Sequence, residues 1–367
     1  MNAPKVDWRR LRPWFINGAA AAAVAGASLA LLWLALRLAG FDASLALGAL
    51  WDGSFGNWYA LTSSTLVRAT PLVLTGLAVA VAFRAGVWNI GADGQLLVGA
   101  AVATAVGLAL GNAPGWVGLP LALLAGALGG GCWAGIAALL RTRFGVLEVI
   151  STIMLNFIAL DLVGYLVRGP LQEPSHAYPQ SNPISARMHL PMLIPGTRLH
   201  WGFVAGVAAA IVLWWGMRST AAGFRVRVIG ANADAARVAC RVDVARTTTN
   251  VLLLSGALSG LAGAIEVCGV TFALYENISP GYGYTAIAVA LLAGLDPLAV
   301  LGTGILFGGL EAGALSMQRE ASVPSVVVTA VEAALVLLLL AMSRRSGALG
   351  AIGRFAGARP TNAEEAP

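Results

Sequence analysis

The chain has 367 residues, of which 58% are hydrophobic and only 11% are charged, and its formal net charge is +6. A soluble protein carries about a quarter charged residues, so the composition excludes an ordinary soluble globular protein. Apolar runs long enough for membrane-spanning helices recur along the chain, whereas the alternating pattern of a membrane β-barrel is absent. The sequence therefore predicts an all-α, polytopic membrane protein.

About ten apolar segments are candidate spans, at 14–36, 66–83, 92–110, 117–140, 146–167, 199–217, 248–270, 282–295, 298–316 and 324–342. The first is too long for the apolar part of a signal peptide, so we expect an uncleaved span. The segment 282–295 has only 14 residues between Gly281 and Asp296. It is short for a crossing and is equally well interpreted as a re-entrant half-helix, which leaves eight to ten crossings.

The basic residues predict the orientation of these segments. With ten crossings, 17 of the 23 lysines and arginines fall on the side of both termini and six on the other side. Cytoplasmic loops are enriched in basic residues, so both termini are predicted to be cytoplasmic. We expect cytoplasmic tails at 1–13 and 344–367 around a membrane domain at 14–343. A proline-rich external loop covers 168–199 and a basic cytoplasmic loop covers 218–246.

The residue types restrict the chemistry that the chain can perform. The single lysine, Lys5, lies near the N-terminus, which excludes a P-loop ATPase and a Schiff-base enzyme. The histidines, His176, His189 and His200, match no zinc pattern, and we expect solvated loop side chains there. No catalytic triad or carboxylate pair has a supporting spacing. We predict neither a cofactor nor an enzymatic activity.

The segment VWNIGADGQLLVGA, residues 87–100, places polar groups among glycines at the start of an apolar run. Asn89, Asp93 and Gln95 are costly there, since a central Asp costs about 2.5–3.5 kcal/mol on insertion scales. One interpretation is an interfacial turn in which Asp93 favours the N-terminus of the next helix. The other is a binding site or path reached through an interrupted helix, and 282–295 is the matching interruption in the second half.

Further polar residues are candidates for the same path. In the fifth segment, four of them have the spacing of one helical face: Glu148, Ser151, Thr152 and Asn156. They either hydrogen-bond to neighbouring helices or line a path, and for Asn156, near mid-span, we favour the path. Glu148 is also placed to meet Arg143 at the cytoplasmic interface. Glu266, late in the seventh segment, is either paired inside the bundle, with Arg68 as a candidate partner, or faces water.

The cytoplasmic loop contains a candidate docking helix. The stretch from Asn232 to Arg241 has Asn232 as a helix cap and Asp234 in the first turn. Arg237 and Arg241 are predicted to share one face of this helix.

These segments together resemble a known family. VWNIGADGQLLVGA resembles the FNIGAEGQ segment of bacterial ABC-transporter permeases of the branched-chain amino acid, ribose and nucleoside importer superfamily. LEVISTIMLNFIA resembles NEVISTIMLNYIA of its nucleoside and simple-sugar branch, and GANADAARVA, LSGALSGLAGAIEV and GYGYTAIAVALLAGLDPLAV come next in the family's order. The resemblance covers about Arg68 to Ala341.

The resemblance implies an inner-membrane permease subunit of an importer for nucleosides or related simple sugars. It further implies a second permease, expected to be a paralogue, two cytoplasmic ATP-binding subunits and an external substrate-binding protein, with no role for nucleic acid. The coupling loop of the family falls on Gly230 to Arg246, where four residues match its pattern: Asn232, Ala235, Ala236 and Arg237.

Several positions depart from the family pattern and leave the identity of the solute open. Asp93 replaces Glu, Leu147 and Asp296 replace Asn, and Cys240-Arg241 occupies the place of a glycine. An alternative function is an ion-coupled secondary transporter with Asp93 and Glu266 as the coupling carboxylates, which the basic loop argues against.

Overall fold

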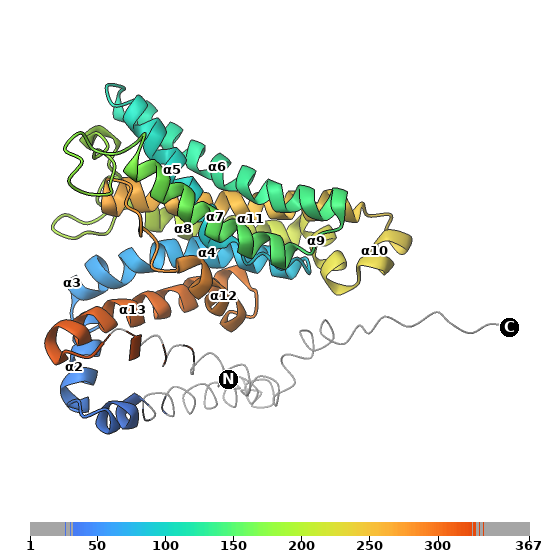
Figure 1. The fold of residues 1–367 in the computed structure, drawn as a ribbon. Coiled ribbons are helices and arrows are strands. Elements are labelled where there is room, and N and C mark those ends of the chain that lie inside the picture. Colours follow the sequence, from blue (N-terminus) through green and yellow to red (C-terminus); the bar gives the residue numbers. More distant parts are fainter. Residues whose placement is uncertain are drawn as a thin grey trace, which may run out of the picture. The chain divides into compact units, whose positions relative to one another are not determined.

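The computed structural model describes residues 32–324 together with residues 26, 30, 326, 327, 330 and 333. This part is helical and contains no β-strand (Figure 1). Seven helical segments in it are long and apolar enough to cross a membrane: Trp58–Arg84, Ala92–Ala109, Gly115–Phe144, Glu148–Arg168, Trp201–Ser219, Val244–Thr271 and Pro297–Ala321. They confirm a polytopic all-α fold. The candidate spans at 14–36 and 324–342 lie largely outside the described residues.

The elements are numbered as in Figure 1. The first half contains α2 (Ala43–Ser54), α3 (Trp58–Ala60), the π-helix η1 (Leu61–Thr65), α4 (Leu66–Arg84), α5 (Ala92–Ala109), α6 (Gly115–Phe144) and α7 (Glu148–Arg168). The second half contains the 3-10 turn η2 (Ala186–Met188), α8 (Trp201–Ser219), α9 (Ala221–Ala231), α10 (Ala233–Ala239), α11 (Val244–Glu266), the π-helix η3 (Val267–Thr271), α12 (Tyr282–Leu292) and α13 (Pro297–Ala321).

The chain divides into two compact units, one made of residues 1–52 and 313–367 and the other of residues 53–312. In the described part of the first unit, an apolar cluster forms around Leu32, Leu36, Ala43 and Met317. The second unit holds every candidate site residue.

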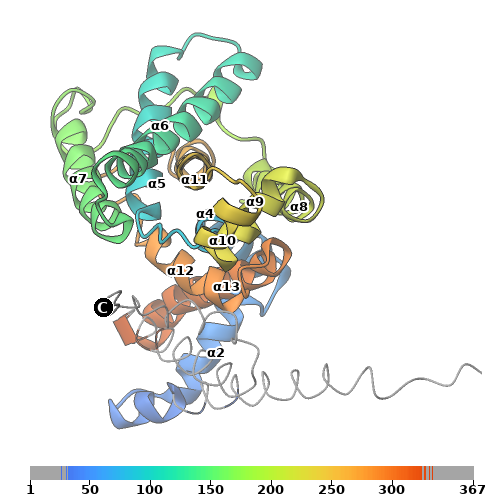
Figure 2. The ribbon, with the colours of Figure 1, turned by 90° about the vertical axis from the view of Figure 1, so that its right-hand side faces the viewer.

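The core of the second unit is built around α11, which packs against α4, α5 and α6. Figure 2 looks nearly along α11 and shows α5, α6 and α4 around it. The packing is close because glycines face each other where these helices cross. A Cβ atom on Gly99 of α5 would collide with the backbone of Gly260 in α11, and one on Gly130 of α6 would collide with Gly256 and Gly260. Backbone therefore contacts backbone at the centre of the bundle.

Two irregular segments interrupt the bundle, one in each half. The first, residues 85–91, joins α4 to α5 and contains Gly86 at a positive φ of 71°. The second, residues 272–281, joins η3 to α12 and begins and ends at positive φ, at Phe272 and Gly281. Helix α12 has only 11 residues, or about 16 Å, roughly half the hydrocarbon thickness of a bilayer. The segment predicted at 282–295 is thus a half-helix after an irregular stretch.

Candidate functional site

The segment 85–91 is held in place by a closed set of amide and hydroxyl hydrogen bonds. Asn89 Nδ2 donates to Gln95 Oε1 at 3.0 Å and to Ser255 Oγ of α11 at 2.8 Å, and Gln95 Nε2 donates back to Asn89 Oδ1 at 3.0 Å. The same Oδ1 accepts from the backbone N–H of Gly91 at 2.9 Å, and Ser255 donates to Ala78 O of α4 at 2.7 Å. All of these side chains are buried, so the network ties the segment to α4 and α11.

The inner face of α7 supplies the next layer of contacts. Asn156 Oδ1 accepts from the N–H of Gly94 at 2.8 Å, and its Nδ2 donates to Ile90 O at 2.9 Å. Thr152 Oγ1 accepts from the N–H of Ile90 at 3.3 Å. The side chains of α7 therefore satisfy backbone groups in and just after a segment that lacks continuous helical hydrogen bonds.

The N-terminal end of α7 is held in the same way. Glu148 accepts from the N–H of Trp88 at 3.2 Å, and its ion-pair partner is Arg141 of α6, where the sequence suggested Arg143. Ser151 donates to Glu148 O of its own helix at 3.2 Å. The predicted common face of Glu148, Ser151, Thr152 and Asn156 is confirmed, because all four side chains are buried on one side of α7.

Asp93 joins the two interrupted segments to each other. Its Oδ1 accepts from Ser279 Oγ at 2.7 Å and from the N–H of Gly283, in the first turn of α12, at 2.9 Å. A Cβ atom on Gly283 would collide with the backbone of Asp93, so α12 begins directly against the first turn of α5. One carboxylate thus lies at the N-termini of two helices, where the helix dipoles favour negative charge. Tyr284 of α12 also accepts from Asn156 Nδ2 at 3.1 Å.

Glu266 lies apart from this network, at the end of α11. It is buried, and Arg68 and Arg198 lie close enough to interact electrostatically with it. Tyr282, the first residue of α12, is also within electrostatic range of Glu266. Arg68 itself forms an ion pair with Glu311 of α13 at 4.0 Å, with Glu266 as a neighbouring carboxylate.

Six of the seven predicted path residues therefore meet at one junction of α5, α7 and the segment 85–91: Asn89, Asp93, Gln95, Ser151, Thr152 and Asn156. Their hydrogen-bonding atoms are largely occupied by other groups of this chain. Their contact with a solute stays a prediction, as does that of Glu266.

The loop 218–246, which the sequence predicts to be cytoplasmic, contains two short helices, α9 and α10. Asn232 caps α10 as predicted, since its Oδ1 accepts from the N–H groups of Asp234 and Ala235 at 3.0 and 2.9 Å. Helix α10 ends at Ala239, and Arg241 follows it at a positive φ of 50°. The predicted shared face of Arg237 and Arg241 is therefore wrong. The left-handed backbone at Arg241 is the conformation that glycine adopts most easily, which explains the glycine of the family pattern.

Helix α10 buries a small residue against its neighbours and exposes larger side chains on its surface. Ala236 is buried in a cluster with Ile229 and Val242, whereas Arg237 is exposed and the side chain of Val238 is 82% exposed. An exposed valine beside an arginine is a suitable contact for another protein. On the other side, a Cβ atom on Gly230 of α9 would collide with the backbone of Arg84, so α9 lies directly on the end of α4.

The histidines in and beside the loop 168–199 were all predicted to be solvated, and only His176 is exposed. His176 is exposed, and His189 stacks on Phe272 with ring centroids 3.9 Å apart. His200 is fully buried, and its Nδ1 accepts from the N–H of Gly202 at 3.2 Å, which caps α8. Burial, with a smaller effect from Arg198, lowers the pKa of His200 to about 4. No cluster of metal-ligating side chains occurs in the described part of the chain.

Seven candidate spans, two interrupted segments that meet inside the bundle and an exposed helix on a basic loop define a membrane transport protein of the permease class. The chain belongs to the family described as the permease component of branched-chain amino acid transport systems, which matches residues 61–342. It is therefore a permease subunit of an ABC transporter.

Three relatives illustrate the family. The chain is 39% identical to the guanosine ABC transporter permease protein NupP of Bacillus subtilis, over 83% of this chain and 88% of that protein. It is 36% identical to the glucose ABC transporter permease protein TsgB13 of Haloferax volcanii, over 92% of this chain and 90% of that protein. It is 27% identical to NupQ, a second guanosine permease protein of Bacillus subtilis, over 68% and 79%. No solved structure matches the chain.

Proposed function

We propose that this chain forms the translocation path of an ABC importer for nucleosides or related simple sugars in the inner membrane of a bacterium. The observation that carries the solute class is its 39% identity, over most of both chains, to a permease protein named for guanosine. The 36% identity to a glucose permease protein keeps simple sugars within the class. The chain itself performs no covalent chemistry.

The proposed complex has a second permease, two cytoplasmic ATP-binding subunits and an external substrate-binding protein. The paralogue is supported by the two different guanosine permease proteins of one organism, NupP and NupQ, which both resemble this chain. The ATP-binding subunits are supported by α9–α10, which presents Arg237 and Val238 on its surface. Both termini are proposed to be cytoplasmic on the basis of the charge distribution.

The contact between α9 and α4 offers a physical route for coupling. An ATP-binding subunit that moves α10 also moves α9, whose Gly230 lies against the backbone of Arg84. The segment 85–91 begins at the next residue, and its hydrogen bonds reach α5, α7 and α11. A displacement at the docking helix is thus transmitted to the junction of the interrupted segments, where two discrete arrangements of the bundle would open the path to one side or the other.

Within this junction, Asn89, Asp93, Gln95, Ser151, Thr152 and Asn156 are proposed to shape the cytoplasmic half of the path, and Glu266 its outer half. The amides of Asn89 and Asn156 would do so by holding the backbone of the segment 85–91 and the start of α5 in place.

The function is tested by uptake of radiolabelled guanosine and glucose into cells that express this chain with its operon partners. We expect ATP-dependent uptake of a nucleoside or a sugar that persists when a protonophore collapses the proton gradient. Uptake that follows the gradient and needs no ATP would instead support the ion-coupled alternative, with Asp93 and Glu266 as coupling groups. A reporter after Arg345 should be cytoplasmic, and a cysteine at Tyr178, in the exposed outer loop, should react from outside.

A further inference from the structure

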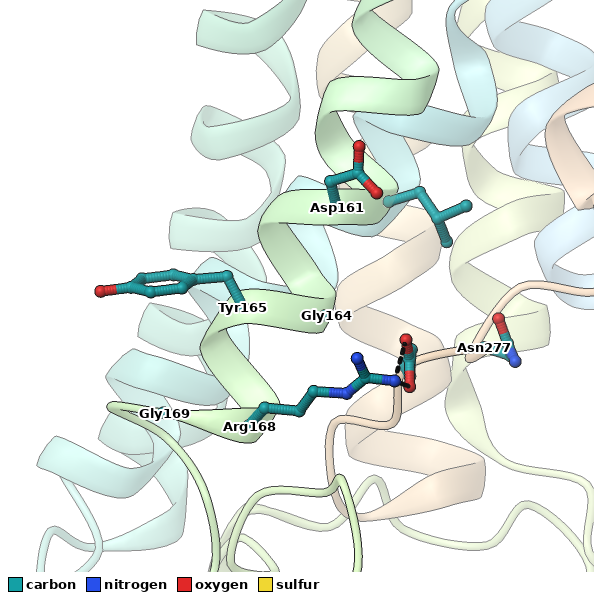
Figure 3. A pocket seen from close by; sticks show the side chains of 8 residues that line it. Asp161, Gly164, Tyr165, Arg168, Gly169 and Asn277 are labelled. Atoms are coloured by element: carbon teal, nitrogen blue, oxygen red, sulfur yellow. Dashed lines mark hydrogen bonds and ion pairs between the residues drawn. The ribbon is translucent and has the colours of Figure 1, made fainter.

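A pocket of about 380 Å³ lies beside the outer half of α7, on the face opposite the hydrogen-bonded junction. Its lining comes from the end of α7 and from the segment 272–281: Leu160, Asp161, Gly164, Tyr165, Arg168 and Gly169, with Glu276 and Asn277. Figure 3 shows Asp161, Arg168 and Asn277 on one side of the helix, whereas the ring of Tyr165 points away. The volume falls in the range of small-molecule sites.

The position of Asp161 indicates whether this pocket faces lipid. It is exposed, it lies about 10 Å along α7 from Arg168, and it forms no hydrogen bond or ion pair within the described residues. An ionised side chain inside a membrane-spanning helix is costly in lipid. The side of α7 that carries Asp161 therefore faces water or protein. The same helix places Phe157 and Ile158, both more than half exposed, in the turn before Asp161. The charge therefore marks a part of the α7 surface that faces water or another protein rather than lipid.

The polar groups of the pocket form a mixed set of donors and acceptors. Arg168 Nη2 donates to both carboxylate oxygens of Glu276, at 2.8 and 2.7 Å. Glu276 lies across Gly164, where a Cβ atom would come within 3.4 Å of its Oε1. The Arg168 Nη1 and the Asn277 amide form no hydrogen bond among the described residues, so they remain available as donors. The Asp161 carboxylate remains available as an acceptor.

We propose that this pocket binds the sugar ring of the transported solute, either a free monosaccharide or the ribose of a nucleoside. Each ring hydroxyl both donates and accepts, so adjacent hydroxyls suit the Asp161 carboxylate on one side and Arg168 and Asn277 on the other. The two carboxylates and one guanidinium leave a net negative charge, which disfavours phosphorylated forms of the same compounds. The proposal rests on the proposed function, whose solute class it narrows to uncharged, ring-shaped polyols.

The test is protection of an introduced cysteine from a hydrophilic thiol reagent. Leu160→Cys is placed in the pocket of the full transporter, in a chain in which the exposed Cys132 and Cys240 are replaced by alanine. We expect labelling from outside and protection by guanosine or by glucose, which separates the two sources of the sugar ring. Guanosine 5′-monophosphate should not protect. Adding Asp161→Asn should raise the concentration needed for half-protection about tenfold, as expected for loss of a charge-assisted hydrogen bond.

Two controls keep the outcomes distinct. Tyr178→Cys, in the loop 168–199, should be labelled and never protected. Tyr59→Phe, at an exposed residue of α3 that does not line the pocket, should leave protection of Leu160→Cys unchanged. An unreactive Leu160→Cys, or labelling that neither guanosine nor glucose slows while the complex imports one of them, overturns the pocket proposal alone. A complex that imports neither a nucleoside nor a sugar overturns the proposed function instead.

Discussion

Helix α7 carries polar residues on two opposite faces, and the two sets have different surroundings. On the buried face, Thr152 and Asn156 direct their hydrogen bonds to the backbone around the segment 85–91. On the other face, Asp161 is exposed without a partner among the described residues, beside the ion pair of Arg168 and Glu276. The polar residues of the buried face thus complete the hydrogen bonds of an irregular backbone, whereas those of the other face are free for the contact with a solute that we propose.

The contrast between the two faces of α7 is tested first by removing a hydrogen-bonding side chain from the buried face. Asn156→Leu leaves the N–H of Gly94 and the carbonyl of Ile90 buried without hydrogen bonds. We expect the free energy of unfolding to fall by about 2–4 kcal/mol, since each unpaired group costs about 1–3 kcal/mol. Denaturation in detergent measures this loss. Asp161→Asn, on the same helix, should change stability by less than about 0.5 kcal/mol.

The same pair of variants also tests the role predicted from the sequence. Uptake normalised to assembled complex should be nearly preserved in Asn156→Leu and reduced in Asp161→Asn. If Asn156→Leu were stable and normalised uptake fell, Asn156 would line the path and the contrast between the two faces would be lost.

The contact between α9 and α4 gives the next largest effect. A methyl group at Gly230 would collide with the backbone of Arg84, and overpacking of this kind costs about 1–3 kcal/mol. We expect Gly230→Ala to lower stability and to reduce transport-coupled ATP hydrolysis. Gly216→Ala is the matched control, because no atom lies within 4 Å of its Cβ position, and it should be neutral or slightly stabilising. Equal effects of both substitutions would refute a role for this contact.

A buried histidine at the start of α8 predicts how stability depends on pH. The pKa of His200 is about 4 in the folded protein, because burial opposes its charge, and 6.5 when unfolded. Between these values the unfolded state binds more protons, so stability is fully present above pH 6.5 and falls by about 1 kcal/mol per pH unit below it. Thermal unfolding between about pH 7.5 and 5.5 measures the slope. His200→Asn keeps an acceptor for the helix cap and should flatten the dependence of stability on pH. If the slope were unchanged, other titrating groups would account for it.

The smallest effect on stability is expected at the docking helix. Arg237→Glu reverses an exposed charge on α10, so the free energy of unfolding should stay within about 0.5 kcal/mol. Association with the ATP-binding subunits should nevertheless weaken about tenfold by repulsion at the contact. Co-purification from membranes measures it, with Arg187→Glu in the external loop as the control. Undiminished co-purification together with normal uptake would exclude α10 as the docking element.

Much of the fold was predictable because its signals are local. Long apolar runs predicted the spans, the Asn232 cap predicted the start of α10, and the 14-residue length of 282–295 indicated an interrupted segment. Arg241 was placed on the wrong element, because a left-handed arginine has no signature in one sequence. His200 was predicted to be solvated, but its burial depends on the packing of Gly202 and Gly269 around its ring, which is a tertiary property.

The site was predictable as a group of residues but not in its hydrogen bonding. Spacing placed Ser151, Thr152 and Asn156 on one face, and the structure confirms that face. Spacing does not reveal the hydrogen-bond partners of Thr152 and Asn156. These partners are backbone atoms in and beside the segment 85–91. Asp161 was overlooked, although an acidic residue within LNFIALDLVGYLVR is a readable signal of a hydrated surface. The pocket beside Asp161 was not predictable, because Glu276 and Asn277, which also line it, lie more than a hundred residues further along the chain.

The glycine contacts between α5, α6 and α11 have a mechanical consequence. Helices whose backbones touch at Gly99, Gly130 and Gly260 can neither slide nor rotate past one another without collisions between main-chain atoms. We therefore expect these three helices to move as one rigid body throughout the transport cycle. Bending is then left to the stretches without continuous helical hydrogen bonds, residues 85–91 and 272–281, which serve as the hinges of the permease.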